Sequence, residues 1–157
     1  MIPISTTSKQ DWGTPDVFYN LVDSLYGPFD LDAAATAKNK KCAQYFSRRN
    51  SGLRNTWKGR RVWCNPPYAR GQLELWTAKA ASEASVNGTF SALLIPAATS
   101  AKWWHTHVIP HARIHFVQGR LRFKGAESPA PFGSAVCVYG PDVKAGTGEP
   151  INARAAA

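Results

Sequence analysis

With 157 residues the chain is long enough for one substantial core. Its residues are 44% apolar and 11% aromatic, a composition that is too apolar for a disordered protein. Nineteen Lys and Arg residues against ten Asp and Glu give a formal net charge of +9, which favours an anionic partner such as nucleic acid over ordinary solubility charge. Every apolar run is far shorter than the ~20 residues of a membrane span, and the first residues lack the pattern of a signal peptide. Three cysteines without Cys-x-x-Cys spacing are typical of reduced thiols in a cytoplasm and disfavour a zinc site.

The first predicted element is a helix that follows a polar, loose N-terminal arm. Thr14 is expected as its N-cap, Pro15 as its first helical residue and Asp16 as the acid of its first turn. The Gly27-Pro28 pair is expected to end it. Between these limits apolar residues recur at helical spacing, which predicts one buried face: Val17, Phe18, Leu21, Val22 and Leu25.

The first core strand is expected over residues 29–35, where an apolar stretch ends in Asp32 and a run of small residues. Small residues after a strand let a ligand approach the backbone closely. Asp30 and Asp32 are two positions apart, so on a strand they share one face, and one of them is expected to contact such a ligand. Doubly wound α/β proteins often carry a Gly-x-Gly pattern after their first strand. In this chain that place is taken by the run Asp32-Ala33-Ala34-Ala35-Thr36-Ala37.

The most informative stretch is an apolar run, residues 62–64, that ends in an asparagine, two prolines and a tyrosine. Each proline fixes φ and lacks an N–H, so the strand must end in a stiff corner, at the place where open α/β sheets bind ligands. Carbonyl oxygens and a flat tyrosine ring together match a planar group that carries an NH2. A proline-rich turn with a packed tyrosine explains the residues equally well. We refer to Asn65-Pro66-Pro67-Tyr68 as the NPPY corner.

Helices and strands alternate beyond the NPPY corner, and prolines or glycines mark their ends. The expected elements are a helix over residues 72–85, a buried strand over 90–95, a helix from residue 100 to before Pro110, and strands over 112–117 and 135–139. The short interval between Asp32 and Asn65 leaves room only for shortened strand–helix units. A doubly wound sheet in this chain must therefore be a reduced one.

The last stretch, residues 141–157, is rich in Gly, Pro and Ala and is expected to be a flexible tail after a single domain over residues 1–140. Three histidines stand close together before it without a matching carboxylate or cysteine pattern, which disfavours a metal site: His105, His107 and His111.

Several segments resemble one enzyme family, in the same order along residues 11–140. The NPPY corner after an apolar strand resembles the signature of S-adenosylmethionine-dependent amino-methyltransferases. Its surroundings narrow the resemblance to the small phage-type DNA N6-adenine methyltransferases. These segments are Asp11-Trp12-Gly13-Thr14-Pro15, Phe29-Asp30-Leu31-Asp32-Ala33-Ala34, Gly52-Leu53 followed by Trp57, and Gly119-Arg120-Leu121-Arg122-Phe123.

The resemblance implies a reduced Rossmann-like methyltransferase fold of the α/β class. Its central sheet is expected to be mostly parallel with an antiparallel C-terminal strand, and helices are expected on both faces. The implied activity is transfer of a methyl group from S-adenosylmethionine to N6 of an adenine that is flipped out of double-stranded DNA, without a metal. The implied location is the cytoplasm, that of a bacterial host if the chain is phage-encoded.

Site residues follow from the resemblance one position at a time. Asn65 and the Pro66 carbonyl are expected to accept from N6, and Tyr68 to stack on the base, so the catalytic set is Asn65, Pro66, Pro67 and Tyr68. The residues expected to bind the cofactor are Trp12, Thr14, Pro15, Asp30, Asp32, Ala33 and Asn65. Phosphate contact and plain surface charge are equal explanations for the basic residues Arg70, Arg120, Arg122 and Lys124.

Two other functions remain open at this stage. One is methylation of another planar amine or amide, such as guanine N2 in RNA, cytosine N4 or a protein glutamine. The other is a non-catalytic DNA-binding protein on a methyltransferase scaffold, which the missing Gly-x-Gly pattern favours. The sequence carries no signal for the oligomeric state or for the DNA target sequence.

Overall fold

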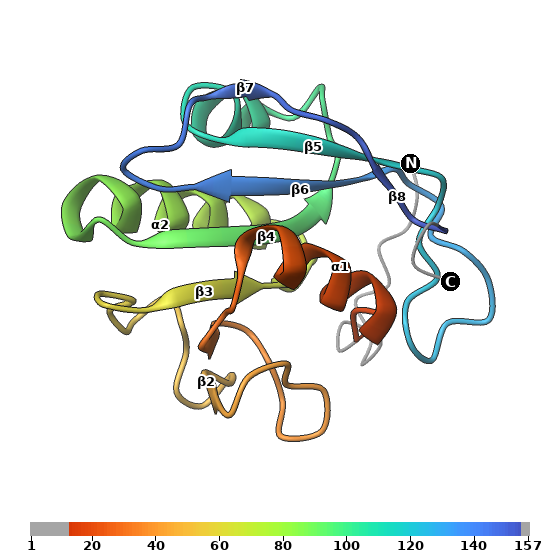
Figure 1. Ribbon diagram of the computed structural model, residues 1–157, viewed down its shortest axis with the longest axis horizontal. Helices are drawn as coiled ribbons and strands as arrows, with labels where there is room; N and C mark the ends of the chain where they lie inside the picture. The colour runs from red at the N-terminus through yellow and green to blue at the C-terminus, as the bar shows by residue number, and fades with distance from the viewer. Residues whose placement is uncertain (1–12, 155–157) are drawn as a thin grey trace.

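The computed structural model describes residues 13–154, and in these residues one mixed sheet carries helices on both of its faces (Figure 1). Trp12, which is expected to bind the cofactor, lies outside the described residues. The helices are α1 (Asp16–Tyr26), α2 (Gln72–Asn87) and the π-helical turn η2 (Trp104–Val108). The strands are β1 (Leu31–Asp32), β2 (Gln44–Tyr45), β3 (Arg61–Cys64), β4 (Phe90–Pro96), β5 (Arg113–Gln118), β6 (Ser134–Tyr139), β7 (Gly146–Thr147) and β8 (Ile151–Asn152).

The strand order across the sheet is β2-β1-β3-β4-β6-β5-β7, and β8 pairs with a further part of β5. The first four strands in this order are parallel to one another, and β6 lies antiparallel between β4 and β5. This topology confirms the expected α/β fold with an antiparallel C-terminal strand. Because β1 and β3 are parallel neighbours, the loops after Asp32 and after Cys64 leave the sheet at the same edge.

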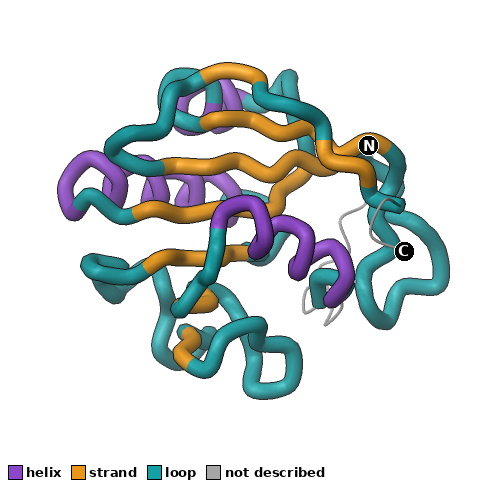
Figure 2. Tube along the Cα trace, viewed as in Figure 1, coloured by secondary structure: helices purple, strands orange, loops and turns teal. Residues whose placement is uncertain are grey.

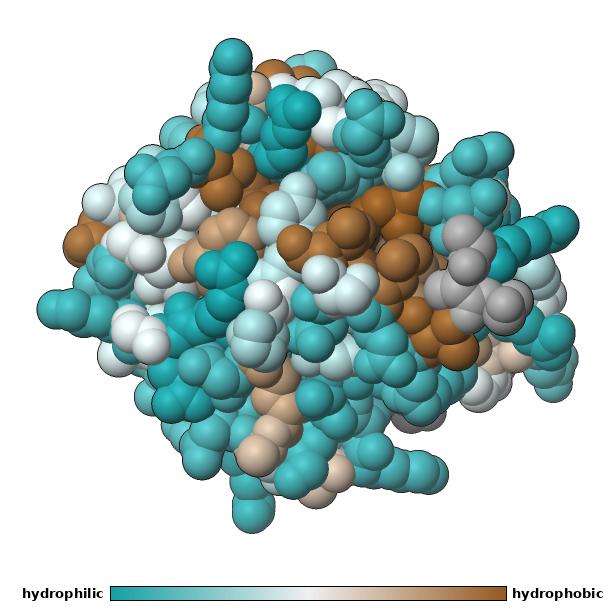
Figure 3. All heavy atoms as spheres, in the orientation of Figure 1, coloured by the Kyte–Doolittle hydropathy of each residue, from teal (hydrophilic) through white to brown (hydrophobic). Residues whose placement is uncertain are grey.

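Two apolar layers hold the sheet, one on each face. Side chains alternate along each strand, so Val62 and Cys64 pack toward α2 and η2, whereas Trp63 packs toward α1. In Figures 1 and 2, α1 crosses in front of the sheet and α2 lies behind it. The outer side of α1 leaves Val17 and Leu25 about half exposed, and on this face apolar side chains stand among a mostly hydrophilic surface (Figure 3).

The start of α1 differs from the prediction that Thr14 is its N-cap. The helix begins at Asp16, and Pro15 is the N-cap residue, with an extended ψ of 135°. The Thr14 side chain is buried, and its Oγ1 accepts a hydrogen bond from Asn65 Nδ2 at 3.1 Å. Asn65 competes with the helix backbone for the Thr14 hydroxyl, which explains why Thr14 does not cap α1.

The last described stretch also differs from the prediction of a flexible tail. Strand β7 pairs in parallel with the start of β5, and β8 pairs with its end. Ile151 is 5% exposed and belongs to the apolar layer on the α1 side. The outer side of β5 offers backbone groups for pairing, and the buried Ile151 together with backbone hydrogen bonds to Ile114 and Gln118 holds the Gly- and Pro-rich segment on it. Residues 146–152 therefore belong to the same sheet as the strands that precede residue 140.

Candidate active site

A cavity of about 480 Å³ opens where the chain leaves β1 and β3. This volume lies in the range of small-molecule sites in proteins. Its walls come from four parts of the chain. These are the entry to α1 with Gly13 and Thr14, the loop after β1 over residues 32–41, the segment around Ser51 and Leu53, and the stretch from Asn65 to Trp76.

Asp32 closes the loop that forms the cavity floor. Its carboxylate is 2% exposed and accepts hydrogen bonds from the backbone N–H groups of Lys41 at 2.9 Å and Ala34 at 3.3 Å. Burial raises the pKa of Asp32 to about 6, although these two N–H groups and the Lys41 charge oppose the rise. The carboxylate thus holds the two ends of the loop together and places a titratable acid at the cavity wall.

The alanine run explains how this loop dispenses with the Gly-x-Gly pattern. Within residues 13–154 every residue with positive φ is a glycine, and none of these glycines lies in the loop over residues 32–41. The loop therefore needs small side chains but not a left-handed backbone. Ala33 is fully buried, and Ala34 and Ala35 line the cavity. Alanines suffice at these positions because only side-chain size limits the approach of a ligand.

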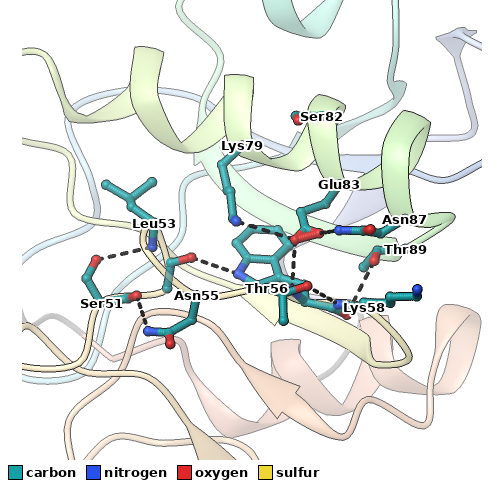
Figure 4. A network of polar contacts seen from close by, with 12 residues as sticks. Ser51, Leu53, Asn55, Thr56, Lys58, Lys79, Ser82, Glu83, Asn87 and Thr89 are labelled. Carbon is teal, nitrogen blue, oxygen red and sulfur yellow. Dashed lines mark hydrogen bonds and ion pairs between the residues drawn. The ribbon is translucent and has the colours of Figure 1, made fainter.

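A buried network fixes the opposite wall. Figure 4 shows Lys79, Glu83 and Asn87 reaching from α2 toward the segment that runs from Ser51 to Lys58. Glu83 accepts a hydrogen bond from the backbone N–H of Trp57 at 2.8 Å, one from Asn87 Nδ2 at 2.7 Å, and pairs with Lys79 Nζ at 3.3 Å. Burial alone would raise the pKa of Glu83, but these donors lower it below its ordinary value, so the carboxylate stays ionised.

Trp57 connects this network to the segment that contributes Ser51 and Leu53 to the cavity wall. Its indole N–H donates to the Gly52 carbonyl at 2.9 Å. A Cβ at Gly52 would lie 2.3 Å from the Ala33 carbonyl oxygen and 3.2 Å from the Trp76 ring. Only glycine lets this segment lie against both the β1 loop and α2. Gly52 and Trp57 thus support the segment whose Leu53 lines the cavity, a role that the sequence pattern alone does not reveal.

The NPPY corner contributes Asn65 and Pro67 to the cavity wall, and Pro66 is buried beneath them. The Asn65 amide donates to Thr14, so the corner and the entry to α1 are joined at the cavity. The corner follows β3, whose last three residues are buried. A rigid strand therefore positions the amide group, as the proline pair predicts.

Tyr68 lies beside the cavity rather than in its wall. Its hydroxyl donates to the Leu94 carbonyl at 2.8 Å, and its ring meets the rings of Phe123 and Phe132 edge-on, with centroids 6.2 and 5.8 Å away. Burial raises the pKa of the Tyr68 hydroxyl well above its ordinary value. The corner thus has the cavity on one side and this aromatic group on the other.

Most of the expected cofactor-binding residues lie at the cavity, but Asp30 does not. Thr14, Asp32, Ala33 and Asn65 line the cavity, and Pro15 adjoins them as the N-cap of α1. Asp30 lies at the amino end of β1, where its carboxylate accepts from the Arg61 N–H at 2.9 Å and pairs with Arg60. Asp30 directly precedes β1 and Asp32 ends it, so only Asp32 reaches the carboxyl end of the strand, where the cavity lies.

The expected DNA-contacting residues on the segment over 119–134 are exposed but already have partners within the chain. The Arg120 guanidinium donates to the Ala130 carbonyl at 3.4 Å, and that of Arg122 donates to the carbonyls of Ala126 and Glu127. The Lys124 ammonium pairs with Asp16. The two arginines thus bond within their own segment and Lys124 joins it to α1, while Arg70 is exposed on the turn after the NPPY corner.

Several residues that line the cavity were not predicted as site residues from the sequence: Lys41, Arg48, Ser51, Leu53, Gln72 and Trp76. Trp76 stands at a helical core position, and it serves both as core and as cavity wall. For Leu53 the signal was present in the Gly52-Leu53 pair, whose role only the close approach of Gly52 to Ala33 explains.

Comparison of the sequence with known proteins assigns the chain to one family. The profile of the family described as DNA N-6-adenine-methyltransferase (Dam) matches residues 4–153. The chain belongs to this Dam family. It is 35% identical over 94 residues to the DNA N-6-adenine-methyltransferase of Escherichia phage T1, an alignment that spans 59% of this chain but only 38% of that protein. It is 27% identical over 129 residues to the enzyme of the same name from Haemophilus phage HP1, over 74% of this chain and 73% of that one.

A solved structure of a putative class I S-adenosylmethionine-dependent methyltransferase from Listeria monocytogenes matches 95% of this Dam-family chain and 68% of its own. The TM-score is 0.55 at 12% sequence identity, which supports a shared fold. Two further observations concern the described part of the Dam-family chain. None of its helices combines the length and apolarity of a membrane span, and no three of its His, Cys, Asp and Glu residues gather as metal ligands would.

Proposed function

We propose that this chain is a DNA N6-adenine methyltransferase that transfers a methyl group from S-adenosylmethionine to an adenine flipped out of double-stranded DNA. The observation that carries the proposal is the position of Asn65. Its amide stands in the wall of a cavity of cofactor size, at the end of a buried strand, and Thr14 holds it there. Membership of the Dam family and the net charge of +9 support DNA as the substrate.

The residues of the cavity fit S-adenosylmethionine by type. Leu53 and Trp76 offer apolar surface to a nucleoside base, and Asp32 and Lys41 bring both signs of charge to a ligand that is itself a zwitterion with a sulfonium. When bound, S-adenosylmethionine supplies a methyl group that its cationic sulfur already activates. The chain therefore needs to supply position rather than a strong base.

Asn65 and Pro66 are the groups that hold the adenine amine. Because the Asn65 Nδ2 atom donates to Thr14, Oδ1 is the amide atom that accepts from N6–H. The Pro66 carbonyl accepts the second hydrogen. Two fixed acceptors favour the positive charge that develops on the amine nitrogen and direct its lone pair toward the methyl group. The proton leaves to solvent after transfer, and no residue of the corner has to store it.

Tyr68 supplies the stacking surface on the other side of the corner. Its edge contacts with Phe123 and Phe132 and its hydrogen bond to Leu94 fix the plane of the ring. A flipped base pays for unstacking and recovers part of that cost by stacking on such a ring. The segment over residues 119–134 thus forms the substrate side of the site.

A methyl-transfer assay with labelled S-adenosylmethionine on DNA, RNA and protein substrates tests the proposal. Label is expected in DNA, and Asn65→Ala is expected to lose at least about a hundredfold in rate, because positioning and fixed acceptors supply most of the catalysis. The matched control is Asn20→Ala on the exposed side of α1, which should keep full activity. Label in RNA or protein alone would contradict the choice of substrate, and an active Asn65→Ala would remove Asn65 from the mechanism.

A further inference from the structure

Asp16, the first residue of α1, joins two lysines that come from opposite sides of the site. Its carboxylate contacts Lys41 Nζ at 2.6 Å and Lys124 Nζ at 2.6 Å. The Lys41 side chain is 7% exposed, whereas those of Asp16 and Lys124 are mostly in contact with water. The hydrogen bonds from Lys124 and Lys41 lower the pKa of Asp16 to about 2, so the carboxylate is ionised at neutral pH.

Lys41 belongs to the cofactor side. It lines the cavity, and its backbone N–H donates to the Asp32 carboxylate at 2.9 Å. The contact with Asp16 therefore fixes the far end of the loop that forms the cavity floor. A ligand that shifts this loop would therefore also shift the contact between Lys41 and Asp16.

Lys124 belongs to the substrate side. Its backbone N–H donates to the carbonyl of Gly13, a cavity-wall residue, at 2.9 Å. Its neighbour Phe123 is buried against the Tyr68 ring. The position of Lys124 thus sets the position of the aromatic group on which the flipped base is proposed to stack.

We propose that Asp16 is a positioning residue that couples cofactor binding to the conformation of the segment over residues 119–134. The inference rests on the proposed function of the site. Isolated exposed ion pairs contribute little to stability, but this carboxylate is shared between two cations whose backbones are each tied to the cavity. Its effect is therefore expected in the coupling of two sites, and by linkage the coupling acts in both directions.

Trypsin reports on this coupling directly, because Arg120, Arg122 and Lys124 are exposed cleavage sites within the segment. S-adenosylhomocysteine serves as a probe that fills the cofactor site without reaction. In the wild-type protein the probe is expected to slow cleavage at Arg120 and Arg122 by about fivefold or more, the lower end of typical coupling factors. In Asp16→Asn the slowing should fall below about twofold.

The control is Asp142→Asn, which removes the same charge from an exposed position and should keep the wild-type protection. Lys124→Gln breaks the same contact from the other side and should lose protection at Arg120 and Arg122 as Asp16→Asn does. Steady-state kinetics gives an independent readout. Asp16→Asn is expected to raise the KM for DNA at least about fivefold, while the melting temperature stays close to that of the control.

Two contrary outcomes are distinguishable. If the wild-type protein does not bind S-adenosylhomocysteine in calorimetry, the proposed function fails and the coupling fails with it. If the probe binds but protects Asp16→Asn and Lys124→Gln as well as the wild-type protein, the proposed function stands and Asp16 is an ordinary surface ion pair.

Discussion

The buried carboxylate of Asp32, at the edge of the cavity, makes the stability of the fold depend on pH. Asp32 has a pKa of about 6 in the folded protein against an ordinary value of 3.8, because burial disfavours its charge. The sign follows from linkage. The protonated form is favoured on folding, so this contribution to stability is fully present below pH 3.8 and is lost as the pH rises through 6.

Asp32→Asn should remove this pH dependence. At about 1.4 kcal/mol per pKa unit, the free energy of unfolding of Asp32→Asn relative to the wild-type protein is expected to rise by about 2 kcal/mol between pH 4 and pH 7. Urea unfolding of both proteins at each pH measures this difference, and the other acids cancel in it. A difference that stays constant over this range would show that Asp32 titrates alike in the folded and unfolded chains.

The Tyr68 hydroxyl and ring have separable tasks. Tyr68→Phe removes the hydrogen bond to the Leu94 carbonyl and is expected to cost about 1 kcal/mol of stability. Because the ring and its contacts with Phe123 and Phe132 remain, methyl transfer should stay within a few-fold of wild type. Tyr68→Ala removes the stacking face and should raise the KM for DNA strongly. Equal kinetics of the Phe and Ala variants would remove stacking from the mechanism.

At the scale of elements, the two walls of the cavity depend on one close approach. Gly52→Ala would place a methyl group 2.3 Å from the Ala33 carbonyl oxygen, so the wall segment or the β1 loop must move. Calorimetry should show S-adenosylhomocysteine binding weakened by about tenfold or more, and a loss of about 1–3 kcal/mol in stability should accompany it. Gly133→Ala is the matched control, because a Cβ there would stand in open space. Unchanged binding in Gly52→Ala would mean that the walls adapt freely.

The helices and the longer strands were predictable from local patterns. Apolar spacing gave α1, α2 and β4, and prolines or glycines gave their ends, because these features act within a few residues. The N-cap of α1 was not predictable, since Asn65 competes for the Thr14 hydroxyl from 51 residues away. Asp32 and the NPPY corner could be placed at one edge, because the carboxyl ends of parallel neighbours meet there.

At the scale of the whole molecule, contacts between distant parts of the chain complete both the sheet and the site. Lys124 and Asp16 are 108 positions apart, so no local pattern indicated that they would meet or that Lys124 already had a partner. The same limit applies to Tyr68, whose hydroxyl pairs with a carbonyl of β4. The residue types of the site were readable from the sequence, whereas the division into a cofactor side and a substrate side required the tertiary structure.

The C-terminal strands provide a test at this scale. Ile151 is buried under β5 and is the main apolar anchor of β8. Ile151→Ala is expected to cost about 2 kcal/mol in the free energy of unfolding, measured by urea denaturation. The control Val143→Ala changes a half-buried residue of the same stretch and should cost less. A wild-type stability of Ile151→Ala would restore the view that this stretch is a loose tail.

We propose that the NPPY corner presents the amine of adenine to the methyl group of S-adenosylmethionine. The most direct measurement is to incubate duplex DNA with the protein and methyl-labelled S-adenosylmethionine, digest the DNA to nucleosides and identify the labelled one. The expected result is label in N6-methyl-2′-deoxyadenosine alone, formed at least about a hundredfold more slowly when Asn65→Ala replaces the wild-type protein. Label in a cytosine or guanine nucleoside, or in no nucleoside although the protein binds S-adenosylmethionine, would contradict the claim.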